Sequence, residues 1–373
     1  MSDRKIRILQ IVPALNVDSG VASFIMNYLR RLDHEKFVVD FAMYKKHKTP
    51  YYKEIKDYGG KIYLLPPVTS FFEHQKKCEA IIGKNKYDII HDNTLTKSLF
   101  LMRSAYVHKV PVRILHSHNA NIGDSKRKKF VNRTVLLRLK KYSTDFVACS
   151  KAAGNCYFEE EKYTVLPNII DETQYVFDPG IRNNVRNKMN VHGKIVICTV
   201  GRMAQQKNPF FALDVIKEIS ENNPDVVYWW IGTGSIADDV REYSHKLGLD
   251  SVVTFLGART DMTDLYQAMD IFFLPSLFEG LPVTGVEEQA MGLPAVISDT
   301  VTKEMVYTDL INYVPLNDPV YKWVDALNKQ IQRIPKRRSY TDELRNSSFS
   351  SENAGQRLET LYENLLKEQE MTR

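Results

Sequence analysis

The chain has 373 residues, which is enough for two domains of ordinary size that each bury their own core. Its apolar fraction of 43% and charged fraction of 26% are those of a soluble globular protein. No stretch approaches the roughly 18 consecutive apolar residues that a membrane helix needs. We therefore do not expect a membrane-spanning protein. The four cysteines form neither a CxxC pair nor a dense disulfide framework, which indicates a reducing compartment.

The charge is distributed unevenly along the chain. Residues 1–160 contain 29 Lys+Arg and 15 Asp+Glu, a balance of +14, and the rest of the chain carries −8, which gives the net +6. Such asymmetry predicts that one domain meets an anionic partner. The first fifteen residues, MSDRKIRILQIVPAL, are interrupted by Gln10 and Pro13 and predict a strand, not a signal peptide. We therefore expect a cytoplasmic protein.

Short apolar strands alternate with helical stretches through the first half of the chain, beginning with a strand at 7–12 and a helix at 21–32. Such alternation predicts a parallel sheet with helices on both faces. The further strands expected here are 38–44, 61–65, 89–91, 112–116, 146–150 and 164–166.

The densest basic segment is 126–141, KRKKFVNRTVLLRLKK, in which eight cations are interleaved with apolar residues. This pattern is typical of an amphipathic helix on an anionic membrane surface. An ordinary surface helix with a solvated basic face is the alternative. Nucleic acid is not expected as a partner, because no nucleic-acid-binding motif accompanies the charge.

A second series of strands begins after a segment at 167–193 that is rich in Asn, Asp and Pro, and that we expect to be a linker. We predict an N-terminal domain at 1–170, a C-terminal domain at 171–350, and a last helix within 351–373 that packs back on the first domain. The expected fold is α/β, with two doubly wound parallel sheets in tandem that face a cleft. The strands of the second series are 194–200, 226–231, 252–256, 271–274, 295–298 and 311–314.

The first strand of the second series ends in a loop suited to a diphosphate. Gly201 lets the backbone approach a ligand, Arg202 and Lys207 supply positive charge, and a helix begins near Pro209. A solvated loop is the alternative. Gly20, at the start of a helix in the first domain, could also bring its N-H to a phosphate, although an N-cap led by Asp18 or Ser19 explains it equally well.

The sequence 232–237, GTGSIA, fits the dinucleotide pattern G-x-G-x-x-A, but it follows the second strand of its series and not the first. We interpret it as a tight strand-to-helix turn. His116 and His118 alternate at the end of a strand and so share one face, where they could bind a metal or a substrate hydroxyl. No third ligand at metal-like spacing lies nearby, and a packed, satisfied side chain is the alternative, above all for His116.

The segment 278–287, FEGLPVTGVE, places Glu279 and Glu287 eight positions apart around a Gly-Leu-Pro turn. A strand, 271–274, precedes the turn and a helix-like stretch, 286–291, follows it. Open α/β sheets bind ligands at such turns, so the two carboxylates suggest a sugar-nucleotide site. Judged by spacing alone, two solvated glutamates are the alternative.

Taken in order, these elements resemble a retaining glycosyltransferase of family 4 with the GT-B architecture, and more narrowly its bacterial capsular and exopolysaccharide members. Single motifs are weak, but their succession is specific and covers nearly the whole chain. The segments that carry the resemblance are DSGVASFIMNYLRRLD, YDIIHDN, VPVRILHSHNA, ACSKAA, VLPNIID, VGRMAQQKN, FLGARTD and LPSLFEGLPVTGVEEQAMGLPAVISD.

The resemblance implies a role for each motif residue. Glu287 would bind the donor ribose, Glu279 would lie against the transferred sugar, and His118 would touch that sugar from the other domain. The remaining donor-binding residues would be Gly20, Arg202, Lys207, Arg259, Gly280, Leu281, Pro282 and Val283. Two departures from the family pattern are Ser19-Gly20 in place of a double glycine and Asn168-Ile169-Ile170-Asp171 in place of Asn-Gly-Ile-Asp.

The activity implied is transfer of a sugar from a nucleotide-diphosphate donor, more specifically a UDP-sugar, to a glycan or lipid-linked acceptor. No cofactor and no metal is expected, because cations of the chain can hold the leaving diphosphate. The first domain, through 126–141, would contact the inner face of the membrane. A sugar-nucleotide epimerase and a non-catalytic basic binding protein are the two alternatives.

Overall fold

The computed structural model describes residues 4–17, 19–123 and 125–371, and the chain divides into two compact units. Unit 1 comprises the chain up to Ile169 together with the segment that begins at Ser351, and unit 2 comprises Ile170–Ser350. The division lies within one residue of the boundary expected at 170. It also separates Ile169 from Ile170 in the segment that departs from the family pattern.

Unit 1 is built on a seven-stranded, fully parallel sheet with strand order β3-β2-β1-β4-β5-β6-β7. The apolar runs of the sequence form these strands because both faces of the sheet are covered by helices. The strands are β1 (Ile6–Val12), β2 (Phe37–Met43), β3 (Ile62–Leu64), β4 (Ile89–Asp92), β5 (Val112–Ser117), β6 (Asp145–Ala148) and β7 (Thr164–Val165). The helices are α1 (Gly20–Leu29), α2 (Tyr51–Asp57), α3 (Phe71–Lys84), α4 (Leu99–Val107), α5 (Lys126–Tyr142), α6 (Lys151–Phe158) and α14 (Ala354–Met371), with a 3-10 turn η1 (Leu95–Lys97).

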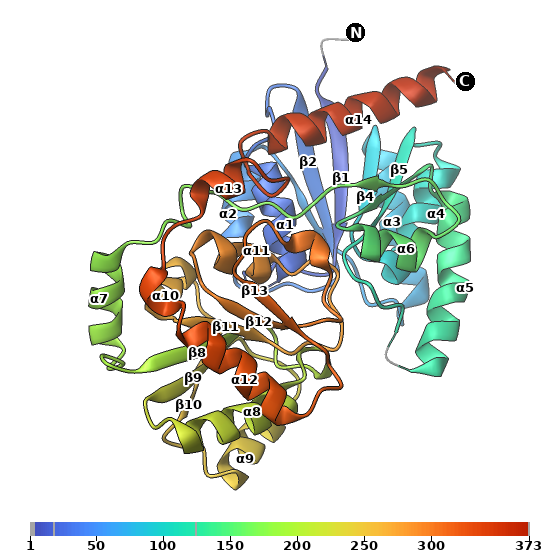
Figure 1. Cartoon of the computed structure of the whole chain (residues 1–373). Helices are drawn as coiled ribbons and strands as arrows, with labels where there is room; N and C mark the ends of the chain where they lie inside the picture. The colour runs from blue at the N-terminus through green and yellow to red at the C-terminus, as the bar shows by residue number, and fades with distance from the viewer. Residues whose placement is uncertain (1–3, 18, 124, 372–373) are drawn as a thin grey trace. The chain divides into compact units, whose positions relative to one another are not determined.

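The last helix, α14, belongs to unit 1, where it packs against α1 and β5 (Figure 1). Leu358 and Tyr362 join the core of this unit. Gly355 permits the approach, because a Cβ at this position would lie 1.8 Å from the carbonyl oxygen of Arg31. The backbone N-H of Asp33 also donates to Glu359, at 2.8 Å. The end of the chain therefore completes the domain in which the chain begins.

Unit 2 repeats the plan with a six-stranded parallel sheet of order β10-β9-β8-β11-β12-β13. Its strands are β8 (Ile195–Val200), β9 (Val226–Ile231), β10 (Val253–Gly257), β11 (Ile271–Leu274), β12 (Ala295–Ser298) and β13 (Ile311–Val314). Its helices are α7 (Pro179–Lys188), α8 (Pro209–Asn222), α9 (Ala237–Lys246), α10 (Met262–Ala268), α11 (Val283–Ala290), α12 (Val320–Ile331) and α13 (Thr341–Arg345). Three 3-10 turns complete it, namely η2 (Gln205–Lys207), η3 (Lys303–Met305) and η4 (Ile334–Lys336).

The segment 167–193, expected to be a linker, contains helix α7, and the expectation is wrong for residues 179–188. Asp178 caps the helix by accepting from two backbone N-H groups, and Pro179 occupies its first turn. Two of its side chains, Val185 and Arg186, are buried. The apolar stripe was too narrow to reveal the helix from periodicity, whereas the Asp-Pro pair was a usable start signal.

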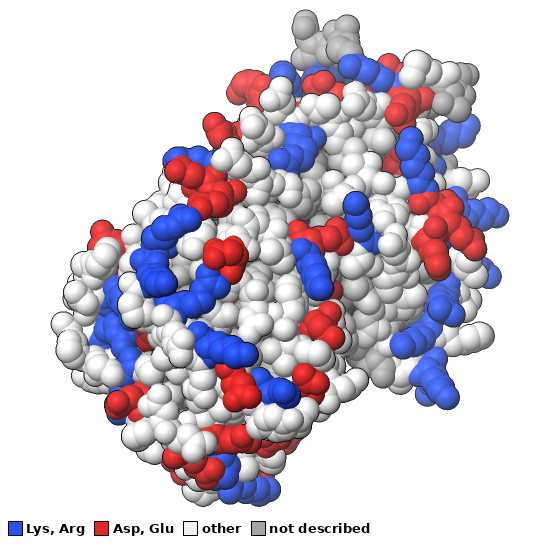
Figure 2. Space-filling model, in the orientation of Figure 1, with Lys and Arg blue, Asp and Glu red and all other residues white. Residues whose placement is uncertain are grey.

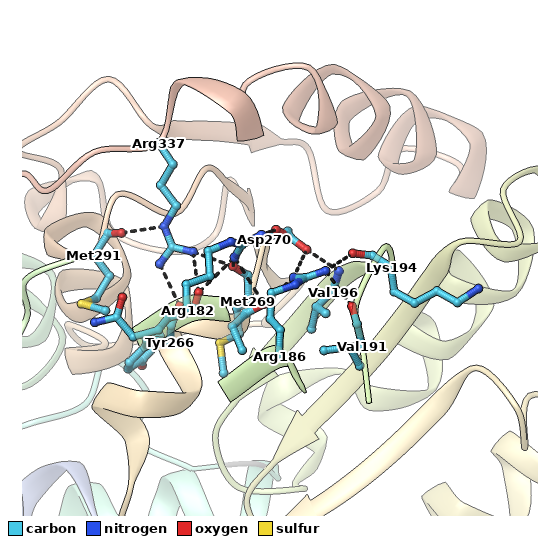
Figure 3. A network of polar contacts seen from close by, with 12 residues as sticks. Arg182, Arg186, Val191, Lys194, Val196, Tyr266, Met269, Asp270, Met291 and Arg337 are labelled. Carbon is cyan, nitrogen blue, oxygen red and sulfur yellow. Dashed lines mark hydrogen bonds and ion pairs between the residues drawn. The ribbon is translucent and has the colours of Figure 1, made fainter. Parts of the chain in front are cut away.

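Arginines attach α7 and the segment around Arg337 to the end of α10 (Figure 3). Arg182 and Arg186 both pair with the buried carboxylate of Asp270. Arg337 donates to the carbonyl oxygens of Tyr266, Gln267, Met269 and Met291. Because the carboxyl end of a helix carries partial negative charge, cations there are favourable. This network holds the outer elements of unit 2 onto its sheet.

Candidate functional site

The strand order of unit 2 reverses between β8 and β11, which are neighbours at the centre of the sheet. In open α/β sheets, ligands bind beyond the carboxyl ends of the strands at such a reversal. The loop after β8 contains Gly201 to Asn208, and the loop after β11 contains the Phe278 to Pro282 turn. The two most informative motifs of the sequence therefore meet at the position where this fold binds ligands.

Gly201 makes room for the side chain of Lys207. Its φ is +153°, and a Cβ on it would lie 2.7 Å from Cε of Lys207. Strand β9 holds the start of this loop. The backbone N-H of Gly201 donates to the carbonyl of Ile231 at 2.8 Å, and Trp230 Nε1 donates to the carbonyl of Gly201 at 3.0 Å. Because Gly201 has no side chain, the side chain of Lys207 can lie close to this backbone, which the two hydrogen bonds hold in place.

The GTGSIA sequence forms the turn from β9 to α9, and it supports the same loop. A Cβ on Gly234 would lie 1.9 Å from the carbonyl oxygen of Met203. The N-H of Met203 donates to the carbonyl of Thr233, at 3.0 Å. Close packing of one loop on another explains these glycines without a dinucleotide ligand.

Lys207 and Glu279 form an ion pair, with 2.7 Å between Nζ and Oε1. Both side chains are nearly buried, at 12% and 8% exposure. Gln206 joins the two loops, since its Nε2 donates to Glu279 Oε2 and to the carbonyl of Phe278, each at 3.0 Å. Its own carbonyl accepts from the N-H of Leu277, at 2.8 Å. Gln206 was not among the site residues expected from the sequence, where its only signal was its position between two motif residues.

The other cations expected at the site differ in their surroundings. Arg202 is exposed, and no acidic side chain in the described part of the chain pairs with it. Arg259 lies after the edge strand β10 and makes a bidentate pair with Asp261, at 2.8 and 2.6 Å. The structure thus places Arg202 on the Lys207 loop and leaves Arg259 two strands away from it.

The turn from Gly280 to Val283 leads directly into α11. Leu281 is buried, Pro282 is the N-cap, and Val283 is the first helical residue. The helix starts three residues earlier than the sequence indicated. Pro282 makes no side-chain cap, and the first N-H groups of a helix have no partner within the helix itself.

Glu287 lies on α11 and is held by two tyrosines. Tyr175 donates to its Oε1 and Tyr266 to its Oε2, each at 2.7 Å. Burial raises the pKa of Glu287, and the two hydroxyls act in the opposite direction. Each carboxylate oxygen still has a lone pair for a ligand. Tyr175 comes from the segment expected to be a linker, and no local pattern identified either tyrosine.

The neighbouring Glu288 has a different environment. Its side chain is fully buried, and neither carboxyl oxygen has a hydrogen-bond partner among the described residues. Burial therefore raises its pKa well above the usual range. This environment favours the neutral, protonated form of Glu288 over the carboxylate.

In unit 1, Gly20 is the first residue of α1 and is exposed. A Cβ on it would meet nothing within 4 Å, so packing does not require a glycine here. Ser19 is the N-cap and accepts from the N-H of Ala22, at 3.4 Å. Asp18, the other residue considered for this cap, lies outside the described residues.

His116 and His118 share one face, and their rings stack with centroids 4.0 Å apart. His116 is fully buried, but its Nε2 has no hydrogen-bond partner among the described residues, so the expectation of a satisfied side chain is wrong for that atom. His118 is partly exposed and bonds to Asn93, at 2.8 Å. His91 lies against His116, a neighbour that spacing did not reveal. Within the described residues, no group of three His, Cys, Asp or Glu side chains could hold a metal ion.

The basic segment forms helix α5, which buries Leu136 and Leu139 against unit 1. Its outer face exposes Phe130 by 73% and Leu137 by 70% among the cations. Figure 2 shows Lys and Arg in blue along the lower part of the edge where Figure 1 draws α5. Across the described ranges, no helix has the length and apolar character to span a membrane.

Comparison with known proteins finds similarity to glycosyltransferases. Residues 194–333 match the family described as Glycosyl transferases group 1. EpsF of Bacillus subtilis (strain 168), a relative that is named among the glycosyltransferases, is 27% identical over 88% of each chain. The UDP-Gal:alpha-D-GlcNAc-diphosphoundecaprenol alpha-1,3-galactosyltransferase of Escherichia coli is 28% identical over 79% of each chain.

Solved structures show the same fold. HepE of Anabaena in complex with UDP-glucose superposes with a TM-score of 0.78 at 17% identity and covers 95% of this chain and 99% of its own. WaaG, a glycosyltransferase of lipopolysaccharide biosynthesis, gives a TM-score of 0.70 at 14% identity and covers 98% and 99%. The predicted GT-B fold with two parallel-sheet units is confirmed, and so is the predicted resemblance to glycosyltransferases.

Proposed function

We propose that this glycosyltransferase is a retaining enzyme of family 4 that moves a sugar from a UDP-sugar to a glycan or lipid-linked acceptor in bacterial cell-surface polysaccharide synthesis. One observation carries the proposal. The loops after β8 and β11 bring Lys207 to Glu279 at the reversal of the sheet, and α11 presents Glu287 from the same motif. A phosphate-binding cation, a sugar-binding carboxylate and a ribose-binding carboxylate are the groups that such a donor requires.

In the proposed reaction, the bond between the anomeric carbon and the diphosphate oxygen breaks, and the acceptor hydroxyl oxygen bonds to that carbon. The electron pair of the broken bond leaves with the diphosphate, and the hydroxyl proton balances part of its charge. Arg202, Lys207 and the first N-H groups of α11 would stabilise the leaving group. Charge-assisted hydrogen bonds of about 1.5 to 3 kcal/mol each correspond to a rate factor of about 10 or more.

We propose that Glu279 orients the sugar and does not attack it. Its two oxygens are already engaged, Oε1 by Lys207 and Oε2 by Gln206. The ion pair with Lys207 lowers the nucleophilicity of the carboxylate, and the hydrogen bond from Gln206 fixes its orientation. Mass spectrometry after incubation with a slow fluorinated donor should find no sugar attached to Glu279. A covalent adduct on that residue would refute this role.

The donor is proposed to be a UDP-sugar for two reasons. HepE, which shares the fold, has been solved with UDP and with UDP-glucose, and the galactosyltransferase relative is named for UDP-Gal and a diphosphoundecaprenol acceptor. The site of this chain adds cations for the diphosphate, so no divalent metal is proposed. Activity should persist in EDTA, and a loss that Mg²⁺ restores would refute metal independence.

The central test is nucleotide binding by calorimetry. Lys207→Ala and Glu287→Ala should each weaken UDP binding by about 10- to 150-fold, because each removes a charged hydrogen-bond partner. Lys217→Ala is the matched control, since Lys217 pairs with Glu221 at the surface of α8. Unchanged UDP affinity in both site variants, with folding intact, would defeat the assignment.

Helix α5 supports the proposal that the acceptor is linked to a lipid. Exposed Phe130 and Leu137 among its cations suit the surface of an anionic membrane, where a lipid-linked acceptor would be found. Neutralising Lys128, Lys129, Arg138 and Lys141 should abolish sedimentation with phosphatidylglycerol vesicles. Neutralising four exposed lysines elsewhere, Lys76, Lys77, Lys322 and Lys329, should not. Equal binding by the two variants would refute membrane contact through α5.

A further inference from the structure

Gln206 connects the two loops that meet at the reversal of the sheet in unit 2. Its backbone carbonyl accepts from the N-H of Leu277, at 2.8 Å. Its side-chain Nε2 lies 3.0 Å from the carbonyl oxygen of Phe278 and 3.0 Å from Oε2 of Glu279. One residue of the loop after β8 therefore holds three successive residues of the loop after β11.

The chemistry of these partners fixes the orientation of the Gln206 amide. A carbonyl oxygen and an ionised carboxylate can only accept, so the NH₂ group must face both of them. Its two hydrogens are then engaged, one by Phe278 and one by Glu279. An ionised glutamate of the same shape could make neither hydrogen bond, and it would place a second negative charge beside Glu279.

The two carboxylate oxygens of Glu279 have different kinds of partner. Oε2 accepts from the neutral amide of Gln206, whereas Oε1 lies 2.7 Å from Lys207 Nζ. Apart from this ion pair, Oε1 is buried and has no hydrogen-bond partner among the described residues. If Lys207 is drawn to another anion, Oε1 therefore needs a new partner, while Oε2 stays held.

The ammonium group of Lys207 lies against the backbone of Gly201 as well as against Glu279. A Cβ on Gly201 would lie 2.7 Å from Cε and 3.3 Å from Nζ of Lys207. The lysine side chain is only 12% exposed. An ammonium group has three hydrogens, and any that it gives to a diphosphate weaken its hold on Glu279. The carboxylate and a diphosphate therefore compete for one cation.

We propose that Gln206 is a positioning residue for Glu279, and that Lys207 exchanges Glu279 for the diphosphate when a donor binds. The inference rests on the proposed function. As Lys207 turns to the diphosphate, Oε1 of Glu279 accepts a hydrogen bond from a hydroxyl of the sugar, so this oxygen is engaged before and after the exchange. Gln206 keeps the carboxylate in place through Oε2. The site thus recognises a diphosphate and a sugar hydroxyl together, whereas a free nucleotide leaves Oε1 without a partner.

Nucleotide binding measured by calorimetry tests the exchange. Glu279→Gln removes the competing charge and keeps the shape of the side chain, so UDP should bind about 10-fold more tightly than to the wild type. If Glu279 instead held Lys207 in the orientation that the phosphate needs, the same variant would bind UDP more weakly. UDP affinity that is unchanged or lower in Glu279→Gln would overturn the exchange.

The ratio of UDP-glucose affinity to UDP affinity tests the positioning role. Gln206→Ala should lower this ratio by about 3- to 10-fold, the effect of one hydrogen bond to the sugar. The isosteric Gln206→Glu should lower it further, because the new carboxylate repels Glu279. Gln205→Ala is the matched control, since Gln205 lies on the same 3-10 turn, is exposed and makes no side-chain hydrogen bond to the described residues. Equal ratios for Gln206→Ala and Gln205→Ala would overturn the positioning role.

A second background separates positioning of the carboxylate from support of the loop. In Glu279→Ala, the further change Gln206→Ala should leave the ratio unaltered, because Gln206 acts through the carboxylate. Loss of the contact with Phe278 alone would instead lower both affinities alike in either background. The same fall in the ratio with and without Glu279 would contradict the positioning role.

The measurements also distinguish this inference from the proposed function. Wild-type protein that binds neither UDP nor UDP-glucose would refute the proposed function. Wild-type protein that binds both, together with a Glu279→Gln variant that binds UDP no more tightly, would refute the exchange alone.

Discussion

The two units share a doubly wound plan but contain opposite kinds of polar network. In unit 1, the network around Asn93 and Tyr362 is made of amides, a phenol and imidazoles. In unit 2, Lys207 pairs with Glu279 beyond the carboxyl ends of the strands, and two arginines pair with Asp270, which precedes β11 at the opposite end of the sheet. The network of unit 1 is therefore held by hydrogen bonds between neutral groups, whereas that of unit 2 is held by ion pairs.

This difference agrees with the division of labour that we propose. A diphosphate needs compensating charge, and unit 2 supplies it at the reversal of its sheet. The imidazoles of unit 1 are neutral, because burial lowers the pKa of His91 and of His118 to about 3, so they offer hydrogen-bond donors and acceptors instead of charge. Under the proposed function, the two networks would therefore serve different parts of the reaction.

The largest expected effect comes from removing the carboxylate at the centre of the charged network. Asp270→Asn leaves Arg182, Arg186 and Arg337 without a counter-charge, and burial already lowers the pKa of Arg337 to about 9. Breaking a buried pair in this way costs about 3 to 5 kcal/mol of unfolding free energy. All three tryptophans, Trp229, Trp230 and Trp323, lie in unit 2, so urea unfolding followed by their fluorescence measures the loss.

The control is Asp238→Asn, because Asp238 pairs with Arg241 while its side chain is fully exposed. This variant should unfold as the wild type does. A loss in Asp270→Asn no larger than that of the control would show that the charged network does not stabilise unit 2.

Removing one member of the neutral network of unit 1 should cost less unfolding free energy than removing Asp270. Tyr362→Phe leaves Gln10 Nε2 and His91 Nδ1 without their shared partner, a loss of about 1 to 3 kcal/mol. Far-ultraviolet circular dichroism should show earlier unfolding of unit 1, while the tryptophan transition of unit 2 stays in place. If the tryptophan transition shifted as much as the circular dichroism transition, the two networks would not stabilise their units independently.

Glu288 is the exception within the charged unit, because it is buried without a partner. Its pKa is raised in the folded state, so the folded protein holds this proton above the pH at which the unfolded chain, with a pKa of about 4.3, has lost it. Stability therefore falls as pH rises above that value, by up to about 1.4 kcal/mol per pH unit.

Glu288→Gln cannot ionise and should remove this dependence, so urea midpoints of the variant and the wild type should diverge with increasing pH. Glu221→Gln, at an exposed site on α8, should keep the wild-type slope. Parallel slopes for Glu288→Gln and the wild type would show that Glu288 is ionised in the folded protein.

The smallest expected effect concerns the support of Glu287. Tyr175→Phe removes one of two hydroxyl donors and leaves Tyr266 in place. UDP affinity, measured by calorimetry, should fall by about 3- to 10-fold, because the carboxylate loses one orienting hydrogen bond. Tyr243→Phe removes a comparable hydroxyl from Asp214 and should leave UDP affinity unchanged. Equal affinities for Tyr175→Phe and Tyr243→Phe would show that Tyr175 does not orient the carboxylate.

The strands of both sheets could be predicted because a parallel strand buried on both faces is an apolar run in the sequence. The runs at Val226–Ile231 and Ile271–Leu274, for example, were expected with the bounds observed. The loops that follow them could be anticipated because their glycine, lysine and glutamate residues occur together, in the order of the family motifs. The helix α7 was missed because only two of its side chains are buried.

The order of the elements, the family resemblance and the charged residues of the site can all be read from the amino-acid sequence. Which of these residues meet, and which partners hold them, follows only from the folded arrangement. Tyr175 and Glu287 are separated by 112 positions, and His91 and Tyr362 by 271. No local pattern encodes such pairs, because periodicity records only which side of an element is buried. The partner of a buried polar atom is fixed by packing, where leaving that atom unpaired is costly.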